Sequence, residues 1–282
     1  MRNPRAARAA VDEVPMKRAG GKAGGKIGGK AGAKIGGSKL AALGGGQAGH
    51  DPRNLLTSLI LVFPLFLVYQ VGVLFTLPVL NGADFLTVFL FRNLHLSTGS
   101  YLAYTFAVAV AFAIAVTVLR HKQRFDPHLI VRVVLESAIY ALTMGSLIVF
   151  VMTRALGISP QLAGGGGFVA QQSFGTRVVM SLGAGVYEET VFRLGILTGL
   201  MVLFDRVIGM RRWLSFPLAL LLQAALFSAM HHIPPYGDPL HVGIFVFRVL
   251  AGVCFGLLYW YRGFAVAVYT HALYDLYVFL VK

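Results

Sequence analysis

The chain has 282 residues, of which 57% are hydrophobic and 13% are charged, and its mean hydropathy is +0.72. A water-soluble domain of this length cannot bury so much apolar surface, so the composition excludes an ordinary soluble protein and indicates an integral membrane protein. The net charge of +14 does not indicate a nucleic-acid partner, because residues 1–53, with 11 basic and three acidic residues, hold +8 of it.

Residues 1–53 are predicted to form a disordered, basic cytoplasmic tail. They contain an approximate four-residue repeat of Gly, Ala and Lys, GGKAGGKIGGKAGAKIGG, and such a composition buries too little apolar area to offset the entropy of ordering. One interpretation is attachment to anionic lipids, to which each basic residue near the surface contributes up to about 1 kcal/mol. The alternatives are a solvated tail, or an upstream extension with the initiator at Met16.

Seven apolar stretches follow, each close to the roughly 20 residues that a membrane-crossing helix needs. They cover approximately residues 54–80, 101–119, 129–153, 175–204, 213–231, 241–261 and 264–281. We therefore predict an all-α, polytopic transmembrane helix bundle of about seven spans over residues 54–282, with six or eight spans as the alternatives.

Basic residues between the spans predict the orientation. If seven spans alternate, three connections lie on the same side as the tail, and they carry Arg120, Lys122, Arg124, Arg206, Arg211, Arg212 and Arg262. By the positive-inside rule this side is the cytoplasm. We expect a multi-pass protein of a bacterial inner (plasma) membrane, with a cytoplasmic N-terminus and an external C-terminus.

Ionisable residues interrupt the spans, and each costs at least about 2.5 kcal/mol on insertion scales, so each calls for a functional hypothesis. In EETVFR, Glu189 and Arg193 are four residues apart on one helix face, whereas Glu188 points about 100° away and is a candidate general base. The alternative interpretation is an ion-paired device for helix packing. Glu136, four residues after Arg132 in the third span, is predicted to form an ordinary ion pair with it.

Two further clusters contain histidine. FSAMHH ends the fifth span with His231 and His232, which face different directions, so at most one of them can share a site with Glu188. HALYD places His271 and Asp275 four residues apart on one face of the last span, where they can act on one substrate group or bind one metal. Each cluster alone is commonly structural, but together they contain the groups needed to activate water and stabilise an oxyanion.

These residues resemble three motifs of the CAAX protease and bacteriocin-processing (CPBP, or Abi) family of intramembrane proteases. EETVFR at 188–193 is similar to the motif EExxxR, FSAMH at 227–231 to FxxxH, and HALYD at 271–275 to HxxxN/D. Their order and spacing agree, and the resemblance covers about residues 175–282. It implies a catalytic pocket within the helix bundle.

By that resemblance, Glu188 and His231 position and deprotonate the attacking water, while His271 and Asp275 bind the scissile carbonyl and its oxyanion. Many members have Asn where this chain has Asp275, and a carboxylate donates a hydrogen bond only when protonated. The aspartate would then orient His271 or ligate a metal.

The resemblance also implies supporting roles and leaves the catalytic type open. Glu189, Arg193 and Phe227 would hold the site together. Both glutamate-type and metalloprotease descriptions exist for the family, and a divalent metal such as zinc, if present, would be bound by Glu188, His231 and His271. No HExxH helix occurs, which removes the strongest sequence argument for zinc.

The predicted function is an intramembrane endopeptidase that hydrolyses a peptide bond near the C-terminus of a membrane-anchored or lipid-modified protein or peptide. One alternative is a non-enzymatic immunity or scaffold protein of the same fold. Another is a proton-coupled transporter in which Glu188, His231 and Asp275 form a relay, although the sequence has no internal repeat of the kind that favours transport.

Overall fold

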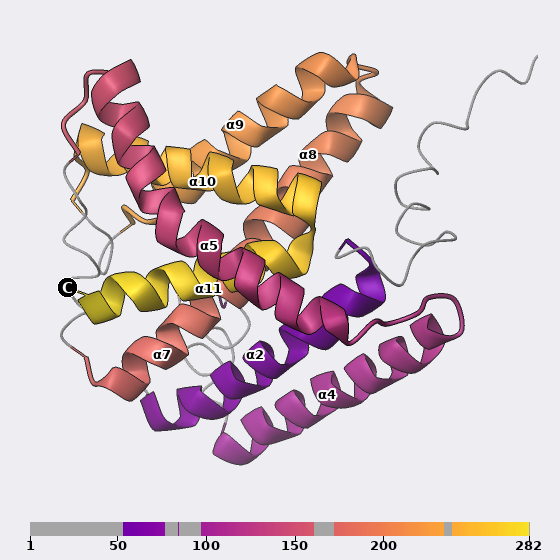
Figure 1. The fold of residues 1–282 in the computed structure, drawn as a ribbon. Helices are drawn as coiled ribbons and strands as arrows, with labels where there is room; N and C mark the ends of the chain where they lie inside the picture. The colour runs from indigo at the N-terminus through magenta and orange to yellow at the C-terminus, as the bar shows by residue number, and fades with distance from the viewer. Residues whose placement is uncertain (1–52, 77–83, 85–96, 161–171, 234–238, 282) are drawn as a thin grey trace, which may run out of the picture. The chain divides into compact units, whose positions relative to one another are not determined.

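The structure is a computed structural model that describes residues 53–76, 84, 97–160, 172–233 and 239–281 (Figure 1). All regular structure in these residues is helical, as predicted. The predicted basic tail lies outside the described residues except for its last residue, Arg53, so its disorder and its boundary stay predictions.

Each of the seven predicted spans corresponds to a helical stretch in the described residues. The first three are α2 (Leu55–Thr76), α4 (Thr98–Arg120) and α5 (His128–Phe150), the last extended by the π-helical turn η3 (Val151–Ala155). The fourth is a composite of α7 (Phe174–Gly183), η4 (Ala184–Glu188), η5 (Thr190–Leu197), α8 (Thr198–Val202) and η6 (Leu203–Val207). The last three are α9 (Arg212–Met230), α10 (Val242–Arg262) and α11 (Phe264–Val281).

Five of these stretches are long and apolar enough to cross a membrane: α2, α4, α5 with η3, α9 and α10. Helix α11 is apolar but shorter over its described residues, and the composite stretch is interrupted by charged residues and by changes of helix type. The predicted class, a helical transmembrane bundle, is confirmed.

The composite stretch contains the wide turns of a π-helix at the EETVFR motif, where η4 ends at Glu188 and η5 begins at Thr190. Each π-turn accommodates one more residue than an α-turn, so successive side chains are separated by a smaller angle, and such turns are frequent at functional sites. Glu188 and Glu189 are accordingly both buried. The local helix type on either side of Glu189 thus differs from the predicted α-helix, while the predicted pairing of Glu189 with Arg193 four residues later is confirmed by the 3.0 Å distance between Oε1 and Nη1.

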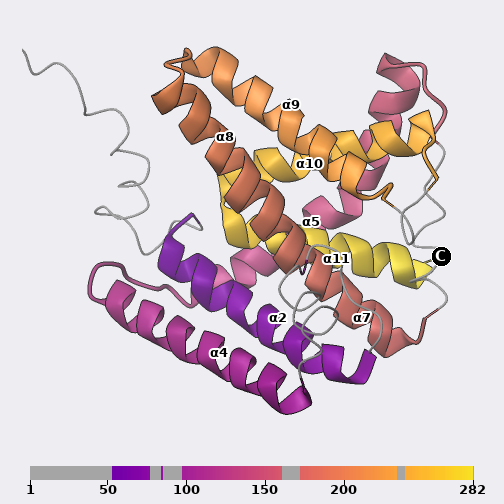
Figure 2. The ribbon, with the colours of Figure 1, turned by 180° about the vertical axis from the view of Figure 1, so that it is seen from behind.

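Helix α11 is the central element, and it packs against α2, α5, α7, η4 and α10 (Figures 1 and 2). Its first turns are buried small and β-branched residues, 265–268, and small residues let helix backbones approach closely in membranes. The closest approach is to Gly185 of η4, where a Cβ atom would lie 2.7 Å from the Val268 carbonyl oxygen and 2.8 Å from Ala272 Cβ. Glycine at this position therefore sets the distance between the EETVFR motif and α11.

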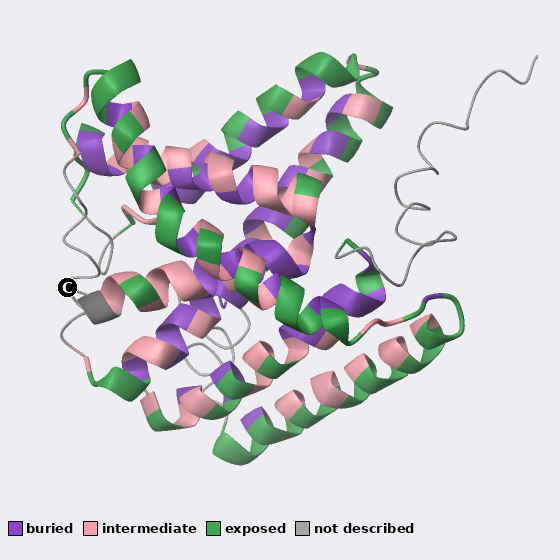
Figure 3. Cartoon of the chain, in the orientation of Figure 1, coloured by how far each residue is buried: buried purple, intermediate pink, exposed green. Residues whose placement is uncertain are grey.

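Helix α4 lies beside α2 at the edge of the bundle (Figures 1 and 2). None of the residues in its most apolar window is buried, and green and pink alternate along it in Figure 3. One face of α4 therefore leaves apolar side chains such as Phe106 and Ile114 exposed, as expected for a helix that borders lipid.

An ion pair connects α5 to the end of α10. Arg262 donates to both carboxylate oxygens of Glu136, at 2.5 and 2.8 Å, and Tyr140 donates to the same carboxylate at 3.1 Å. The hydrogen-bonded partner of Glu136 is therefore Arg262 rather than the predicted Arg132, because the packing of α10 against α5 brings a distant guanidinium closer than the local one.

Candidate active site

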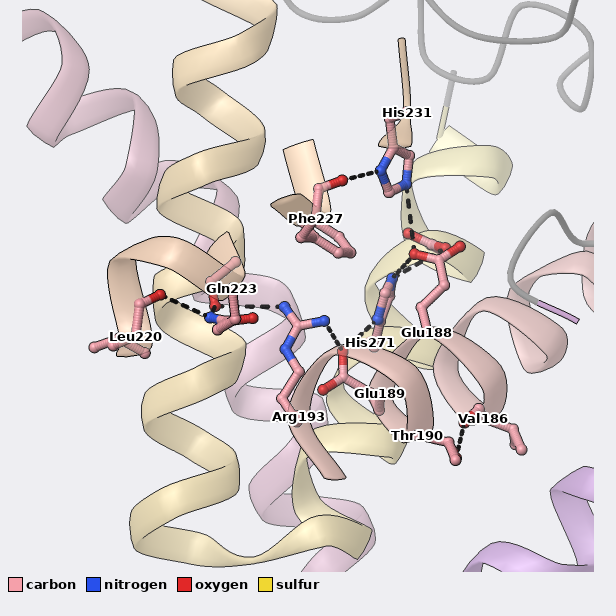
Figure 4. Close-up of polar contacts among 12 residues, drawn as sticks. Val186, Glu188, Glu189, Thr190, Arg193, Leu220, Gln223, Phe227, His231 and His271 are labelled. Carbon is pink, nitrogen blue, oxygen red and sulfur yellow. Dashed lines mark hydrogen bonds and ion pairs between the residues drawn. The ribbon is translucent and has the colours of Figure 1, made fainter. Parts of the chain in front are cut away.

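Three helical segments bring the three motifs to one place between the helices (Figure 4). The π-helical region supplies Glu188 and Glu189, the C-terminal end of α9 supplies His231, and α11 supplies His271 and Asp275. The structure therefore brings together all four residues predicted to be catalytic.

Glu188 lies between the two histidines. Its Oε2 atom is 3.4 Å from Nε2 of His231 and 3.8 Å from Nε2 of His271. One carboxylate oxygen thus faces the Nε2 atoms of imidazoles from two other helices.

His271 is held by carboxylates at both of its ring nitrogens. Its Nδ1 donates to Oε1 of Glu189 at 2.7 Å, while its Nε2 lies 3.8 Å from Glu188 and 3.6 Å from Oδ2 of Asp275. The hydrogen bond at Nδ1 fixes the orientation of the ring. Glu189 therefore orients His271, and Asp275 lies near the other ring nitrogen, Nε2.

His231 is oriented by the end of its own helix. Its Nδ1 donates to the Phe227 carbonyl at 2.7 Å, one of the last carbonyl groups of α9, which have no partner within the helix. This bond turns Nε2 toward Glu188. The neighbouring His232 instead stacks on Phe245, with ring centroids 5.9 Å apart, so only one of the two histidines faces Glu188, as expected.

Aromatic rings enclose the imidazoles. Phe255 of α10 stacks on His271 with 4.4 Å between ring centroids and 16° between planes. Phe227 presents its ring to both histidines, with centroids 4.7 Å from His231 and 6.1 Å from His271. These contacts restrict rotation of the imidazoles and replace water around them with apolar groups.

Arg193 is completely buried beside the site. Its Nη1 lies 3.0 Å from Oε1 of Glu189, the oxygen that also accepts from His271. The guanidinium lies over the rings of Phe227 and Phe255, at 4.5 and 5.2 Å from their centroids, which is a favourable position for a cation. A buried charge is tolerated when it is paired and hydrogen-bonded; Glu189 supplies the opposite charge, and the Gly252 carbonyl accepts a hydrogen bond from Nη2.

Groups from α9 and α10 lie next to the arginine. Arg193 Nη2 donates to the Gly252 carbonyl at 3.4 Å, and the buried Gln223 donates to the same carbonyl at 2.9 Å. A Cβ atom at Gly252 would lie 2.9 Å from Ala224 Cα, so glycine here lets α10 approach α9 closely. Gln223, Gly252 and Phe255 were not predicted from the sequence. Only Gln223, a polar residue eight positions before His231 in an apolar run, gives a signal that could have been noticed.

Exposure rises across the site in one direction. The side chains of Glu189 and Arg193 are 0% exposed, that of Glu188 is 10% exposed, and those of His231 and Asp275 are each 23% exposed. Among the described residues, the more exposed side of the site is therefore the side of His231 and Asp275.

The predicted metal ligands can be tested against this arrangement. Carboxylate and imidazole are suitable zinc donors, but within the described residues no group of three His, Cys, Asp or Glu side chains is arranged to hold a metal ion. The described residues as placed therefore do not form a metal-ligand set.

The fold and the site define a helical membrane protein with a carboxylate and imidazole centre between its helices. Residues 170–277 match a family model described as Rce1-like, type II CAAX prenyl endopeptidase Rce1-like. The match contains all three motifs and confirms the resemblance to the CAAX protease and bacteriocin-processing family over this segment. Residues 170–277 therefore form a CAAX-protease-type region of an integral membrane protein. No curated protein sequence and no solved structure matches the chain.

Proposed function

We propose that this protein is an intramembrane endopeptidase whose hydrolytic water is activated by Glu188 together with His231. The observation that carries the proposal is the position of Glu188 Oε2, 3.4 and 3.8 Å from the Nε2 atoms of His231 and His271. The substrate is a membrane-embedded or lipid-anchored protein or peptide, and the scissile bond lies near its C-terminus.

The proposed first step is attack by water. With Nδ1–H of His231 bound to the Phe227 carbonyl, its neutral ring has a lone pair at Nε2, toward Glu188. A water beside this pair donates a hydrogen to the carboxylate, His231 helps to position it, and its oxygen points at the substrate carbonyl. Glu188 takes a proton as the oxygen attacks, and general-base help of this kind contributes about 10²- to 10⁴-fold.

The proposed second role is stabilisation of the tetrahedral intermediate. In its imidazolium form His271 donates from Nδ1 to Glu189 and from Nε2 to the oxyanion. Asp275, 3.6 Å from that Nε2, contributes a second donor when protonated. Glu188 then transfers its proton to the leaving amine, which completes hydrolysis and regenerates the carboxylate.

Two features support a membrane substrate. Two of the helices that enclose the site, α9 and α10, are long and apolar enough to cross a membrane, so an extended segment would enter the site from within or beside the bilayer. The matching family model is named for CAAX prenyl endopeptidases, and we infer a lipid-modified or membrane-anchored C-terminal segment here by analogy. The positive-inside pattern supports an inner-membrane protein with a cytoplasmic N-terminus.

The test is cleavage of a panel of membrane-anchored peptides by the purified protein in lipid nanodiscs. Wild type is compared with Glu188→Gln, His231→Ala and His271→Ala, and thermal unfolding is measured for each. Two matched controls are His241→Ala, at an exposed histidine, and Glu136→Gln, at the carboxylate paired with Arg262.

Folded Glu188→Gln is expected to lose activity by about 10³-fold, in line with the loss of a general base, whereas both controls keep activity per folded molecule. Cleavage by folded Glu188→Gln at the wild-type rate would contradict the mechanism. A wild-type protein that cleaves nothing but moves protons across vesicles would favour the transporter alternative.

A further inference from the structure

A cavity of about 620 Å³ lies between α2, the end of α4 and the connection to α5, away from the residues of the active site. Its lining residues are Ile60, Val116, Arg120, Gln123, Arg124, Phe125 and Pro127. The lining thus combines apolar side chains with two guanidinium groups.

The cavity has an apolar side and a cationic rim. Phe112 of α4 stacks on Phe63 of α2 with 3.6 Å between ring centroids and 3° between planes. Phe112, Val116 and Arg120 are spaced by four residues, so they follow one face of α4. Along that face the chemistry changes from stacked rings, through an aliphatic side chain, to a cation at the helix end.

Hydrogen bonds to α2 hold the rim in place. Gln123 is buried, and its Oε1 accepts from the Leu56 backbone N–H at 3.0 Å. Asn54 donates to the Arg124 carbonyl at 3.4 Å. The backbone that carries the two arginines is therefore attached to the start of α2.

The two guanidinium groups are available to a ligand. Arg120 and Arg124 are both exposed, and neither forms an ion pair with a carboxylate among the residues that the structure describes. The nearby Asp126 accepts from the His128 backbone N–H at 3.0 Å, at the start of α5. The rim is therefore positive.

The surroundings indicate a lipid. Helix α4 packs on α2 and its apolar window contains no buried residue, so the cavity borders the bilayer. The connection after α4 is one of those predicted to be cytoplasmic, and the cytoplasmic leaflet contains anionic lipids that basic pockets between transmembrane helices bind. We propose that the cavity binds one anionic phospholipid, with its phosphate at Arg120 and Arg124 and an acyl chain against Ile60 and Val116.

The experiment uses the full-length protein in detergent, titrated with phosphatidylglycerol and followed by native mass spectrometry. The double variant Arg120→Gln/Arg124→Gln is expected to raise the dissociation constant of the first bound lipid at least about tenfold, since each basic residue contributes on the order of a fivefold change. The matched control, Lys122→Gln/Arg211→Gln, removes the same charge from exposed residues that do not line the cavity and is expected to bind as wild type. Equal weakening by both variants would indicate diffuse attraction and overturn the proposal.

A second variant separates a lipid site from a phosphate site. Val116→Trp fills the apolar part while leaving both arginines, and it is expected to weaken phosphatidylglycerol binding, with thermal unfolding showing that the variant is folded. Glycerol 3-phosphate and inorganic phosphate are expected not to displace the lipid at millimolar concentration. Displacement by either, together with wild-type binding by Val116→Trp, would mean that the cavity binds free phosphate and that the proposal is wrong.

Discussion

Glu189 and His271 are joined by a 2.7 Å hydrogen bond between residues 82 positions apart. The preceding residue, Glu188, faces the other nitrogen of the same ring at 3.8 Å. Two consecutive carboxylates therefore contact opposite sides of one imidazole, and one of them also pairs with the buried Arg193. The two glutamates therefore have different surroundings: Glu189 is paired with Arg193 and His271, whereas Glu188 faces the Nε2 atoms of His231 and His271.

Replacing Glu189 with Gln should both destabilise the protein and abolish activity. The substitution leaves the buried Arg193 charge uncompensated, which costs about 3 to 5 kcal/mol, and removes the carboxylate at Nδ1 of His271. The double variant Glu189→Gln/Arg193→Met should regain most of the stability, because no buried charge remains, but stay inactive. Denaturant unfolding in detergent and the peptide assay measure the two effects. A double variant as unstable as the single one would show that the ion pair is not the cause.

Gly185→Ala should separate the EETVFR motif from α11. The new Cβ would lie 2.7 Å from a backbone oxygen of α11, and overpacking of this kind costs about 1 to 3 kcal/mol. Since Glu188 and Glu189 move with η4, activity per folded molecule should also fall. The matched control is Gly199→Ala in α8, where a Cβ atom meets nothing within 4 Å. Wild-type activity in Gly185→Ala would mean that the close approach is not required.

Gln223→Leu should act on stability more than on chemistry. The change removes the 2.9 Å hydrogen bond that joins α9 to the Gly252 carbonyl of α10, and losing one such bond costs about 0.5 to 1.5 kcal/mol. The melting temperature should fall, while kcat of the folded fraction changes by less than about tenfold. A large loss of kcat at unchanged stability would place Gln223 in the catalytic machinery instead.

Asp275→Asn should remain active, whereas Asp275→Ala should not. An amide has a permanent donor for the oxyanion, while a carboxylate donates only when protonated, and losing one oxyanion donor costs about 10²- to 10³-fold in kcat. Comparing kcat of the two variants at equal folded concentration tests this role. An inactive but folded Asp275→Asn would indicate that the negative charge beside His271 is what matters.

Cleavage should persist in a strong chelator. The reason is geometric: no three ligating side chains in the described part of the chain are arranged as a metal site, and Glu188 with His231 is sufficient to activate water in the proposed mechanism. The measurement is the initial rate before and after dialysis against the chelator. Loss of activity that zinc restores would assign Glu188, His231 and His271 as metal ligands.

Much of the molecule was predictable from one sequence. Apolar length is a local property, so the helical class and the approximate positions of all seven stretches could be predicted. The three motifs were recognisable because ionisable residues are rare in apolar spans. The relative positions of Glu188, His231 and His271 could be expected only through the family resemblance, since no spacing along the chain determines contacts between helices.

The sequence by itself therefore determined that the chain is a helical membrane protein and which ionisable residues lie in its spans, because hydrophobicity and charge are properties of each residue. Only the tertiary structure decided which side chains are in contact.

Glu136 pairs with Arg262 rather than with Arg132. Glu189 binds both Arg193 and His271, and Gln223 of α9 donates to the backbone of α10 beside the site. The structure also has π-helical turns on either side of Glu189 and a close approach of two helices at Gly185. Neither the π-helical turns nor the close approaches can be predicted from neighbouring residues in the sequence, because apolar helices of similar composition can pack together in many ways.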